Sequence, residues 1–154
     1  MIAGVAAGLV VVLTPIRTLI FKRSVHGLSR DESASVSCAL NAAFVATHEA
    51  FQIAPGDAAS ENDARVTRAS EAAAKFNLAI EAAAPRLGRL ADGCAKFGQL
   101  VSDAQLQVMA FAINRKNRGE TGGADFESEI ADRKVFMRDA QPIVHDLSAA
   151  LGSR

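Results

Sequence analysis

The sequence predicts an all-α protein, with an N-terminal transmembrane helix followed by an antiparallel, up-down helical bundle with coiled-coil-like packing. Three observations support this prediction. The composition includes 8 Phe but no Trp or Tyr and leans on Ala, which favours helix over sheet. An apolar stretch occupies the N-terminus, and a seam of apolar residues spaced alternately three and four apart runs through the middle of the chain.

The N-terminal stretch, residues 2–21, contains a single charged side chain, Arg17. An α-helix needs about 20 such residues to cross a hydrocarbon layer of about 30 Å. The basic residues of the stretch and its flank all lie toward its C-terminal end, and they are Arg17, Lys22, Arg23 and Arg30. By the positive-inside rule, this asymmetry places the bulk of the chain in the cytoplasm.

We therefore expect a single-pass membrane protein with an anchor at residues 1–23, a juxtamembrane linker at 24–29 and a cytoplasmic helical bundle at 30–154. Pro15 and Arg17 count against a regular span, because Pro removes a backbone donor and Arg must reach the headgroups. The alternative is that residues 2–21 form a core helix of a soluble bundle or a helix lying in the membrane interface.

The segment from Pro15 to Ser29 resembles the first helix and loop of the PQ-loop sugar transporters. The similar residues are Pro15, Lys22 with Ser24, and Gly27-Leu28-Ser29. Ile16 stands where that family has Gln, and the chain after Pro55 is amphipathic and charged rather than continuously apolar. No transport residue is carried over from the resemblance.

The first helix of the bundle is expected over residues 30–54. Ser29 and Glu32 have the spacing of a capping box, in which each side chain bonds the other residue's backbone N–H. The segment Pro55-Gly56-Asp57 then ends the helix. The seam expected on this helix consists of Leu40, Phe44, Thr47, Phe51 and Ala54.

The next helix begins near Glu61 and carries the long seam. The seam residues are Val66, Ala69, Ala73, Phe76, Ile80, Ala83, Leu87, Leu90, Cys94, Phe97, Val101, Ala104, Val108 and Phe111. The seam keeps its phase through Pro85 and Gly93, although such residues interrupt helices. A membrane anchor requires a sharp turn between Pro85 and Gly93, because a straight helix returns Arg86 and Arg89 to the lipid. Without an anchor, one kinked helix is the alternative.

The last helix follows a loop at residues 117–123, which is rich in glycine and polar residues. Asp125 is the expected cap, Arg133 interrupts the seam and Pro142 is expected to kink the helix. The seam residues are Phe126, Ile130, Met137, Ala140, Val144, Leu147 and Leu151.

The formal net charge is zero, which argues against a nucleic-acid partner because phosphate binding needs a basic face. The charge is nevertheless uneven along the chain. Residues 31–63 contain six acids and no Lys or Arg, whereas residues 64–118 contain nine basic and four acidic residues. Acidic helices are therefore expected beside a basic one.

We find no catalytic, cofactor or metal motif and expect no enzyme. His48 and Glu49 are adjacent on a helix and point about 100° apart, so they do not share a ligand. His145 and Asp146 are expected to form a solvated surface pair. Two cysteines are too few for a zinc site. We expect Cys38 and Cys94 to have free thiols and to be buried as small hydrophobic residues.

The sequence predicts a non-enzymatic, membrane-tethered scaffold or accessory subunit of a membrane protein assembly, with protein partners or a second copy. The candidate interaction residues lie off the main seam or at the basic end of the long helix, and they are Leu100, Leu106, Ile113, Arg115, Lys116 and Arg118. The functional alternatives are a sensory or signalling bundle, or a phage-type envelope bundle, coupled to a membrane helix.

Overall fold

The computed structural model describes residues 26–52, 59–118 and 124–152, with the side chains at 59–62, 115–118 and 124–127 outside the description. The described part contains four α-helices and no strand. The prediction of an all-helical bundle is confirmed for these residues.

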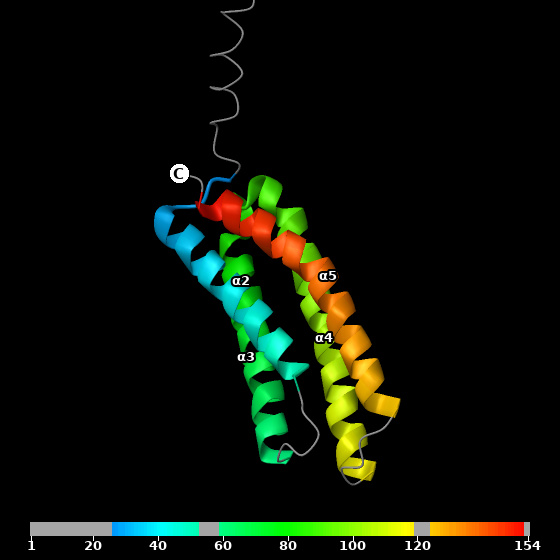
Figure 1. Cartoon of the computed structure of the whole chain (residues 1–154). Helices are drawn as coiled ribbons and strands as arrows, with labels where there is room; N and C mark the ends of the chain where they lie inside the picture. The colour runs from blue at the N-terminus through cyan, green and yellow to red at the C-terminus, as the bar shows by residue number, and fades with distance from the viewer. Residues whose placement is uncertain (1–25, 53–58, 119–123, 153–154) are drawn as a thin grey trace, which may run out of the picture.

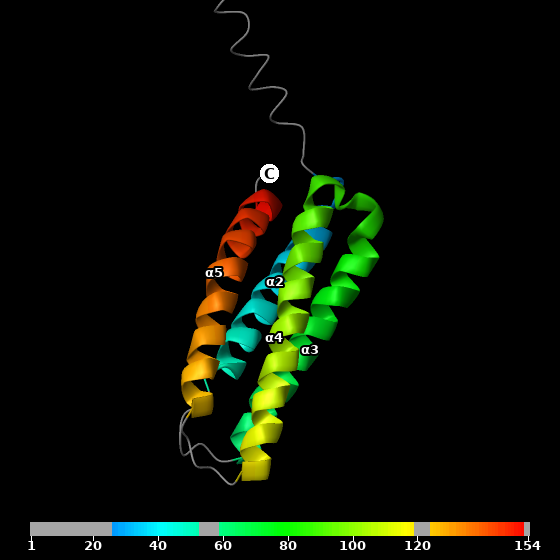
Figure 2. The ribbon, with the colours of Figure 1, turned by 90° about the vertical axis from the view of Figure 1, so that its right-hand side faces the viewer.

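The helices are α2 (Arg30–Ala50), α3 (Ala59–Ala83), α4 (Ala91–Arg118) and α5 (Ala124–Gly152). Successive helices run in opposite directions, as Figures 1 and 2 show. One end of the bundle therefore holds the start of α2, the connection between α3 and α4, and the end of α5. We call it the linker end, because residues 26–29 also lie there, and we call the opposite end the distal end. At a rise of about 1.5 Å per residue, α4 alone spans roughly 40 Å.

The start of α2 is fixed by the predicted capping box. The Ser29 hydroxyl accepts from the Glu32 N–H at 3.1 Å, and the Glu32 carboxylate accepts from the Ser29 N–H at 2.7 Å. These bonds pair two backbone donors at the helix start with side-chain oxygens. The backbone bond from Ser29 is the largest cause of a lowered pKa at Glu32. The helix ends at Ala50, four residues before the predicted boundary.

The connection between α3 and α4 is a sharp turn, as an anchored bundle requires. Two single-turn 3₁₀ helices, η1 (Ala84–Arg86) and η2 (Gly88–Leu90), reverse the chain. Gly88 has a φ of 55°, which glycine adopts without the steric cost that a Cβ atom adds. Pro85 lies in the first turn of η1, where its missing N–H costs no helical bond. The alternative of one kinked helix is therefore wrong.

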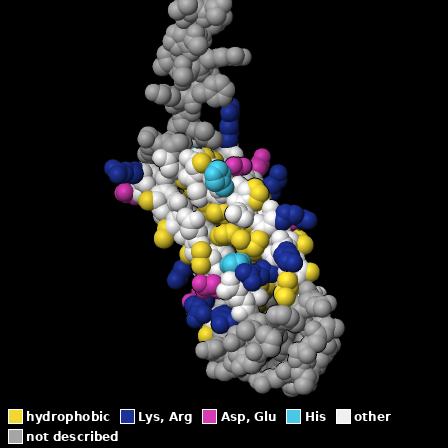
Figure 3. All heavy atoms as spheres, in the orientation of Figure 1, with side chains coloured by type: hydrophobic (Ala, Val, Ile, Leu, Met, Phe, Trp, Pro, Cys, Tyr) yellow, Lys and Arg dark blue, Asp and Glu magenta, His cyan; other side chains and the backbone are white. Residues whose placement is uncertain are grey.

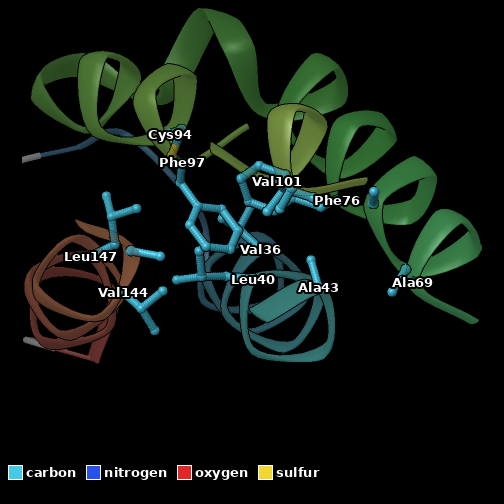
Figure 4. Packing of buried hydrophobic residues seen from close by; sticks show 14 of the residues in the cluster. Val36, Leu40, Ala43, Ala69, Phe76, Cys94, Phe97, Val101, Val144 and Leu147 are labelled. Atoms are coloured by element: carbon cyan, nitrogen blue, oxygen red, sulfur yellow. The ribbon is translucent and has the colours of Figure 1, made fainter. Parts of the chain in front are cut away.

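The long seam forms the centre of the bundle. Eleven of its members are buried, namely Ala69, Ala73, Phe76, Ala83, Leu87, Leu90, Cys94, Phe97, Val101, Ala104 and Val108. Phe76 and Phe97 meet edge to face with ring centroids 5.1 Å apart, an arrangement that aromatic rings favour. Figure 4 shows Phe97 pointing from α4 toward Leu40 of α2 and toward Val144 and Leu147 of α5. One core thus joins all four helices.

The face that α2 buries differs from the predicted one. Its buried residues are Ser33, Val36, Leu40, Ala43, Thr47 and Ala50, whereas Phe44 is only partly buried. Val36, expected off the seam, is 2 % exposed. The change follows from the neighbours of α2: one side packs on α3 and another on α5, so two adjacent 3-4 rows are covered.

Helix α5 is continuous through Pro142. Four residues of the predicted seam are buried, namely Ala140, Val144, Leu147 and Leu151, while Ile130 and Met137 are partly buried and the side chain of Phe126 lies outside the description. Phe136, which was not predicted, is also buried. Asp125 lies inside the helix and is not its cap.

Within the described residues, no helix combines the length and apolar composition needed to cross a membrane. The anchor predicted at residues 1–23 lies outside those residues. The transmembrane part of the fold prediction therefore has no support from the structure, and the division into anchor, linker and bundle stays a prediction.

Candidate interaction surfaces

The described residues contain no group of three or more His, Cys, Asp or Glu side chains that could hold a metal ion. A gap bounded by Thr47, Ala69 and Val108 between α2, α3 and α4 has no room for a water molecule. His145 and Asp146 form a pair at 3.5 Å whose side chains are 82 % and 85 % exposed. The prediction of a solvated surface pair at this position is confirmed.

An apolar stripe lies on the outer face of α4, in its distal half. Leu106, Met109 and Ile113 are 68 %, 45 % and 57 % exposed, and their spacing of three and four places them on one side of the helix. Leu106 and Ile113 were predicted as interaction residues, and both are accessible. Leu100 was also predicted, but it packs against the core because it lies beside the buried Phe97 and Val101 row. We exclude it from the α4 stripe, defined as Leu106, Met109 and Ile113.

The structure describes only some of the basic residues that were predicted as interaction residues or as the membrane flank. Arg115, Lys116 and Arg118 lie in the last turns of α4, at the distal end, and their side chains are outside the description. Arg30 is exposed and begins α2. Arg17, Lys22 and Arg23 lie outside the described residues.

The linker is tied to two other parts of the bundle. The Gly27 N–H donates to the Arg86 carbonyl at 2.8 Å, and His26 Nε2 lies 3.3 Å from the Ala150 carbonyl oxygen. Leu28 is 2 % exposed and joins the core. Arg86 also pairs with Glu32 through its side chain. The linker is therefore attached to the α3–α4 turn and to the end of α5.

A second polar contact joins α2 and α5 nearer the distal end. Arg133 Nε and a terminal guanidinium nitrogen lie 3.1 Å and 2.9 Å from His48 Nε2. The Phe136 ring stacks on Phe44 and tilts against Phe51, with centroids 6.0 Å and 5.9 Å apart. We call these five residues the α2–α5 contact. On the face that Figure 3 shows, hydrophobic, basic and histidine side chains gather along these two helices.

Sequence analysis missed the α2–α5 contact because it treated His48 and Arg133 separately. His48 was considered only as a metal or acid-base residue, and Arg133 only as an interruption of the seam. The useful signal was the spacing of Phe44, His48 and Phe51, which places them on one face of α2. Arg133 and Phe136 share a face of α5 for the same reason.

The two cysteines lie in different environments. Cys94 is 2 % exposed, and burial raises the pKa of its thiol to about 11. Cys38 is exposed, contrary to the prediction, because it lies on the face of α2 opposite the buried row through Val36, Leu40 and Ala43. Both thiols are free.

No protein-family model matches the sequence, and no curated protein and no solved structure matches the chain. The resemblance to PQ-loop transporters has no support from these comparisons. The function therefore has to be inferred from the sequence and from the geometry of the bundle.

Proposed function

We propose that the chain is a non-enzymatic, membrane-tethered helical bundle that acts as a scaffold or accessory subunit of a membrane protein assembly. The apolar stretch at residues 2–21 supplies the tether, and the α4 stripe supplies a surface for a protein partner or a second copy.

The observation that carries this proposal is the attachment of the linker. Residues 26–28 bond the α3–α4 turn and the end of α5, so His26, which follows Phe21 by five residues in the sequence, is held at the linker end. At that end the chain turns back within η1 and η2, which keeps exposed Arg86 and Arg89 at the level of headgroups rather than in lipid. The four described helices also bury Leu40 and Phe97 completely without a fifth helix, which favours a tether over a core helix.

The position of the α4 stripe suits a protein partner. Leu106, Met109 and Ile113 lie in the half of α4 that runs toward the distal end (Figure 2), away from a membrane at the linker end. Exposed apolar side chains gathered on one helix face are typical of helix-in-groove contacts.

Membrane fractionation of the full-length chain tests the tether. We expect the protein to stay with membranes after a carbonate wash. Exposed Cys38 then serves as a native topology label, and we expect an impermeant thiol reagent to modify it only after the cells are lysed. Cys38→Ser is the control, because it removes the accessible thiol. Release by carbonate would favour the soluble bundle, whereas labelling in intact cells would favour the sensory or envelope alternative.

Charge substitutions test the partner surface separately. We expect Leu106→Asp with Ile113→Asp to lower the assembly state of the detergent-purified protein, as measured by sedimentation. The matched control is Leu78→Asp, which changes an equally exposed leucine (64 %) on α3. An unchanged sedimentation pattern in the stripe variant would remove the α4 stripe from the proposal.

A further inference from the structure

Two histidines contact α5: His48 does so through an unprotonated ring nitrogen, and His26 through Nε2, which faces the Ala150 carbonyl. At His48, both Arg133 nitrogens within hydrogen-bond distance are donors, because a guanidinium has no acceptor. His48 Nε2 must therefore carry a lone pair, which leaves the ring neutral with its proton on Nδ1. The contact exists only in this protonation state.

A proton on His48 Nε2 reverses the contact. It removes the acceptor and places an imidazolium 2.9 Å from a guanidinium that keeps its charge. His48 and Arg133 are both half-buried, and the Phe44, Phe51 and Phe136 rings pack on the same seam, so water screens the two charges only in part. A movement of α5 away from α2 relieves the repulsion.

His26 makes the second contact with α5, at the linker end. Its Nδ1 accepts from the Leu28 N–H at 3.3 Å, which leaves Nε2 to donate to the Ala150 carbonyl. His26 is 5 % exposed. This contact ties the linker to the end of α5.

The charged residues around these histidines do not cancel the effect. Beside His48, Glu49 precedes the end of α2, Asp132 adjoins Arg133 on α5, and buried Glu129 lies one helical turn from Arg133. Arg65 of α3 donates to the Gln52 carbonyl just beyond α2. Glu49 raises the pKa of His48, but burial, first, and Arg133, second, lower it further, so the net direction is down.

The residues that α3 and α4 place around Thr47, which adjoins His48, carry no charge and include Val66, Ala69, Gln105 and Val108. Near His26, the α3–α4 turn contributes Arg86, whose side chain pairs with Glu32 of α2.

We propose that proton uptake by His48 releases α5 from α2, so that mild acid opens the bundle along the α2–α5 contact. This opening couples the linker, and any membrane segment before it, to pH, because His26 bonds the end of α5. The proposal does not depend on the tether, because His48, Arg133 and His26 lie within the described residues.

The sign of the pH effect follows from linkage. The pKa of His48 is lower in the closed bundle than in a solvated histidine, so the open state binds the proton more tightly. The stability that neutral His48 gives the closed bundle over the open one is fully present above about pH 6.5, the ordinary histidine pKa. It is lost as the pH falls from there through the lowered pKa of His48. The pKa values of Glu32 and Asp139 are also lowered, so these carboxylates keep their charge through this range.

The native cysteines report the opening. The exposed Cys38 thiol reacts in both the closed and the open bundle and serves as an internal reference. The buried Cys94 thiol reacts only when the residues packed over it move away. That cover includes α5, because Leu147 packs against Gly93, the residue before Cys94. We would follow both thiols of the full-length protein in detergent with a pyridyl disulfide, a reagent that reacts in acid as well as at neutral pH.

We expect the rate of Cys94 relative to Cys38 to rise between about pH 7.5 and pH 5.5, by at most about tenfold, because one histidine can bias the equilibrium by no more than tenfold for each pH unit below its ordinary pKa. His48→Gln should abolish the rise, because the Gln side-chain oxygen accepts from Arg133 without titrating. Arg133→Gln tests the contact independently, since it keeps a donor and removes the charge, and it should reduce the rise. His145→Gln is the matched control and should behave as wild type.

Two results would overturn the proposal. One is a wild-type Cys94 rate that follows Cys38 unchanged through this pH range. The other is an acid-induced rise that persists in His48→Gln or that is unchanged in Arg133→Gln.

Discussion

The α3–α4 hairpin and helix α5 are held in the same core by different chemistry. The hairpin closes on an uninterrupted apolar row, with Phe76 against Phe97 and a turn at Gly88 that needs no polar partner. Helix α5 shares the apolar core but also buries Glu129, which is 3 % exposed, and binds histidines at two levels. The packing of the hairpin is therefore insensitive to histidine protonation, whereas the packing of α5 on α2 depends on the protonation of His48.

The largest expected effect comes from breaking the core that both regions share. Phe97→Asp places an unpaired carboxylate at a fully buried site, and it costs more than the about 3–5 kcal/mol of a Phe→Ala change. We expect loss of the helical circular dichroism signal at room temperature, because small domains have only about 5–15 kcal/mol of stability. Leu78→Asp is the exposed control. A fully helical Phe97→Asp protein would show that the seam does not form the core.

Removing the aromatic anchor of α5 separates the two regions. Phe136→Ala loses both ring contacts and should lower the free energy of unfolding by about 3–5 kcal/mol. Hydrogen exchange should accelerate in α5 before it does in α3 and α4. Val135→Ala changes the half-exposed neighbour and should stay within about 0.5 kcal/mol of wild type. Equal acceleration in all four helices would contradict the distinction between the regions.

The hairpin turn depends on one backbone conformation. Gly88→Ala forces a Cβ atom into a positive φ and should cost about 1–2 kcal/mol in chemical denaturation. Gly88→Asn should cost less, because asparagine tolerates this conformation. If the alanine and asparagine variants lost equal stability, the left-handed φ would not be the cause.

Two glycines on α4 give the smallest effect and sharpen the comparison. At Gly98 an added Cβ meets Phe76 and Asn77 at 3.8 Å, so Gly98→Ala should gain about 0.5–1 kcal/mol from helix propensity. At Gly93 it meets Leu147 of α5 at 3.0 Å. We therefore expect Gly93→Ala to gain less stability than Gly98→Ala, or to lose stability, when both variants are compared with wild type by thermal unfolding. A larger gain at Gly93 would mean that α5 does not press on α4 there.

Much of the fold could be predicted from the sequence because its strongest signals are local. The capping box at Ser29 and Glu32 fixes its own geometry. Pro85 and Gly93 indicated where the helix could break, but a sharp turn and a kinked helix stayed alternatives because the seam keeps its phase through both residues. The long seam was identified because an apolar row on one helix face has a single way to be buried.

The errors arose where burial is decided by a neighbouring helix. On α2, Ala and Ser occupy both candidate rows, so the sequence does not distinguish the row through Val36 from that through Phe44. Leu100 is similarly ambiguous, because it lies at the edge of the buried row and is only partly buried.

The α2–α5 contact was beyond prediction because it depends on pairing between distant residues. His48 and Arg133 are 85 positions apart, and neither belongs to a local motif. Their partnership depends on the relative heights of α2 and α5. Those heights follow from the packing of Phe44, Phe51 and Phe136 rather than from any spacing within one helix.

The attachment of the linker has a mechanical consequence. A pull on the chain ahead of His26 would not peel α2 away from its first turn, because Gly27 is held by Arg86 and His26 by Ala150. The force is instead divided among the start of α2, the α3–α4 turn and the end of α5. If the His26 bond were lost, α5 would no longer bear part of the force, which would then act on α2 and on the α3–α4 turn alone.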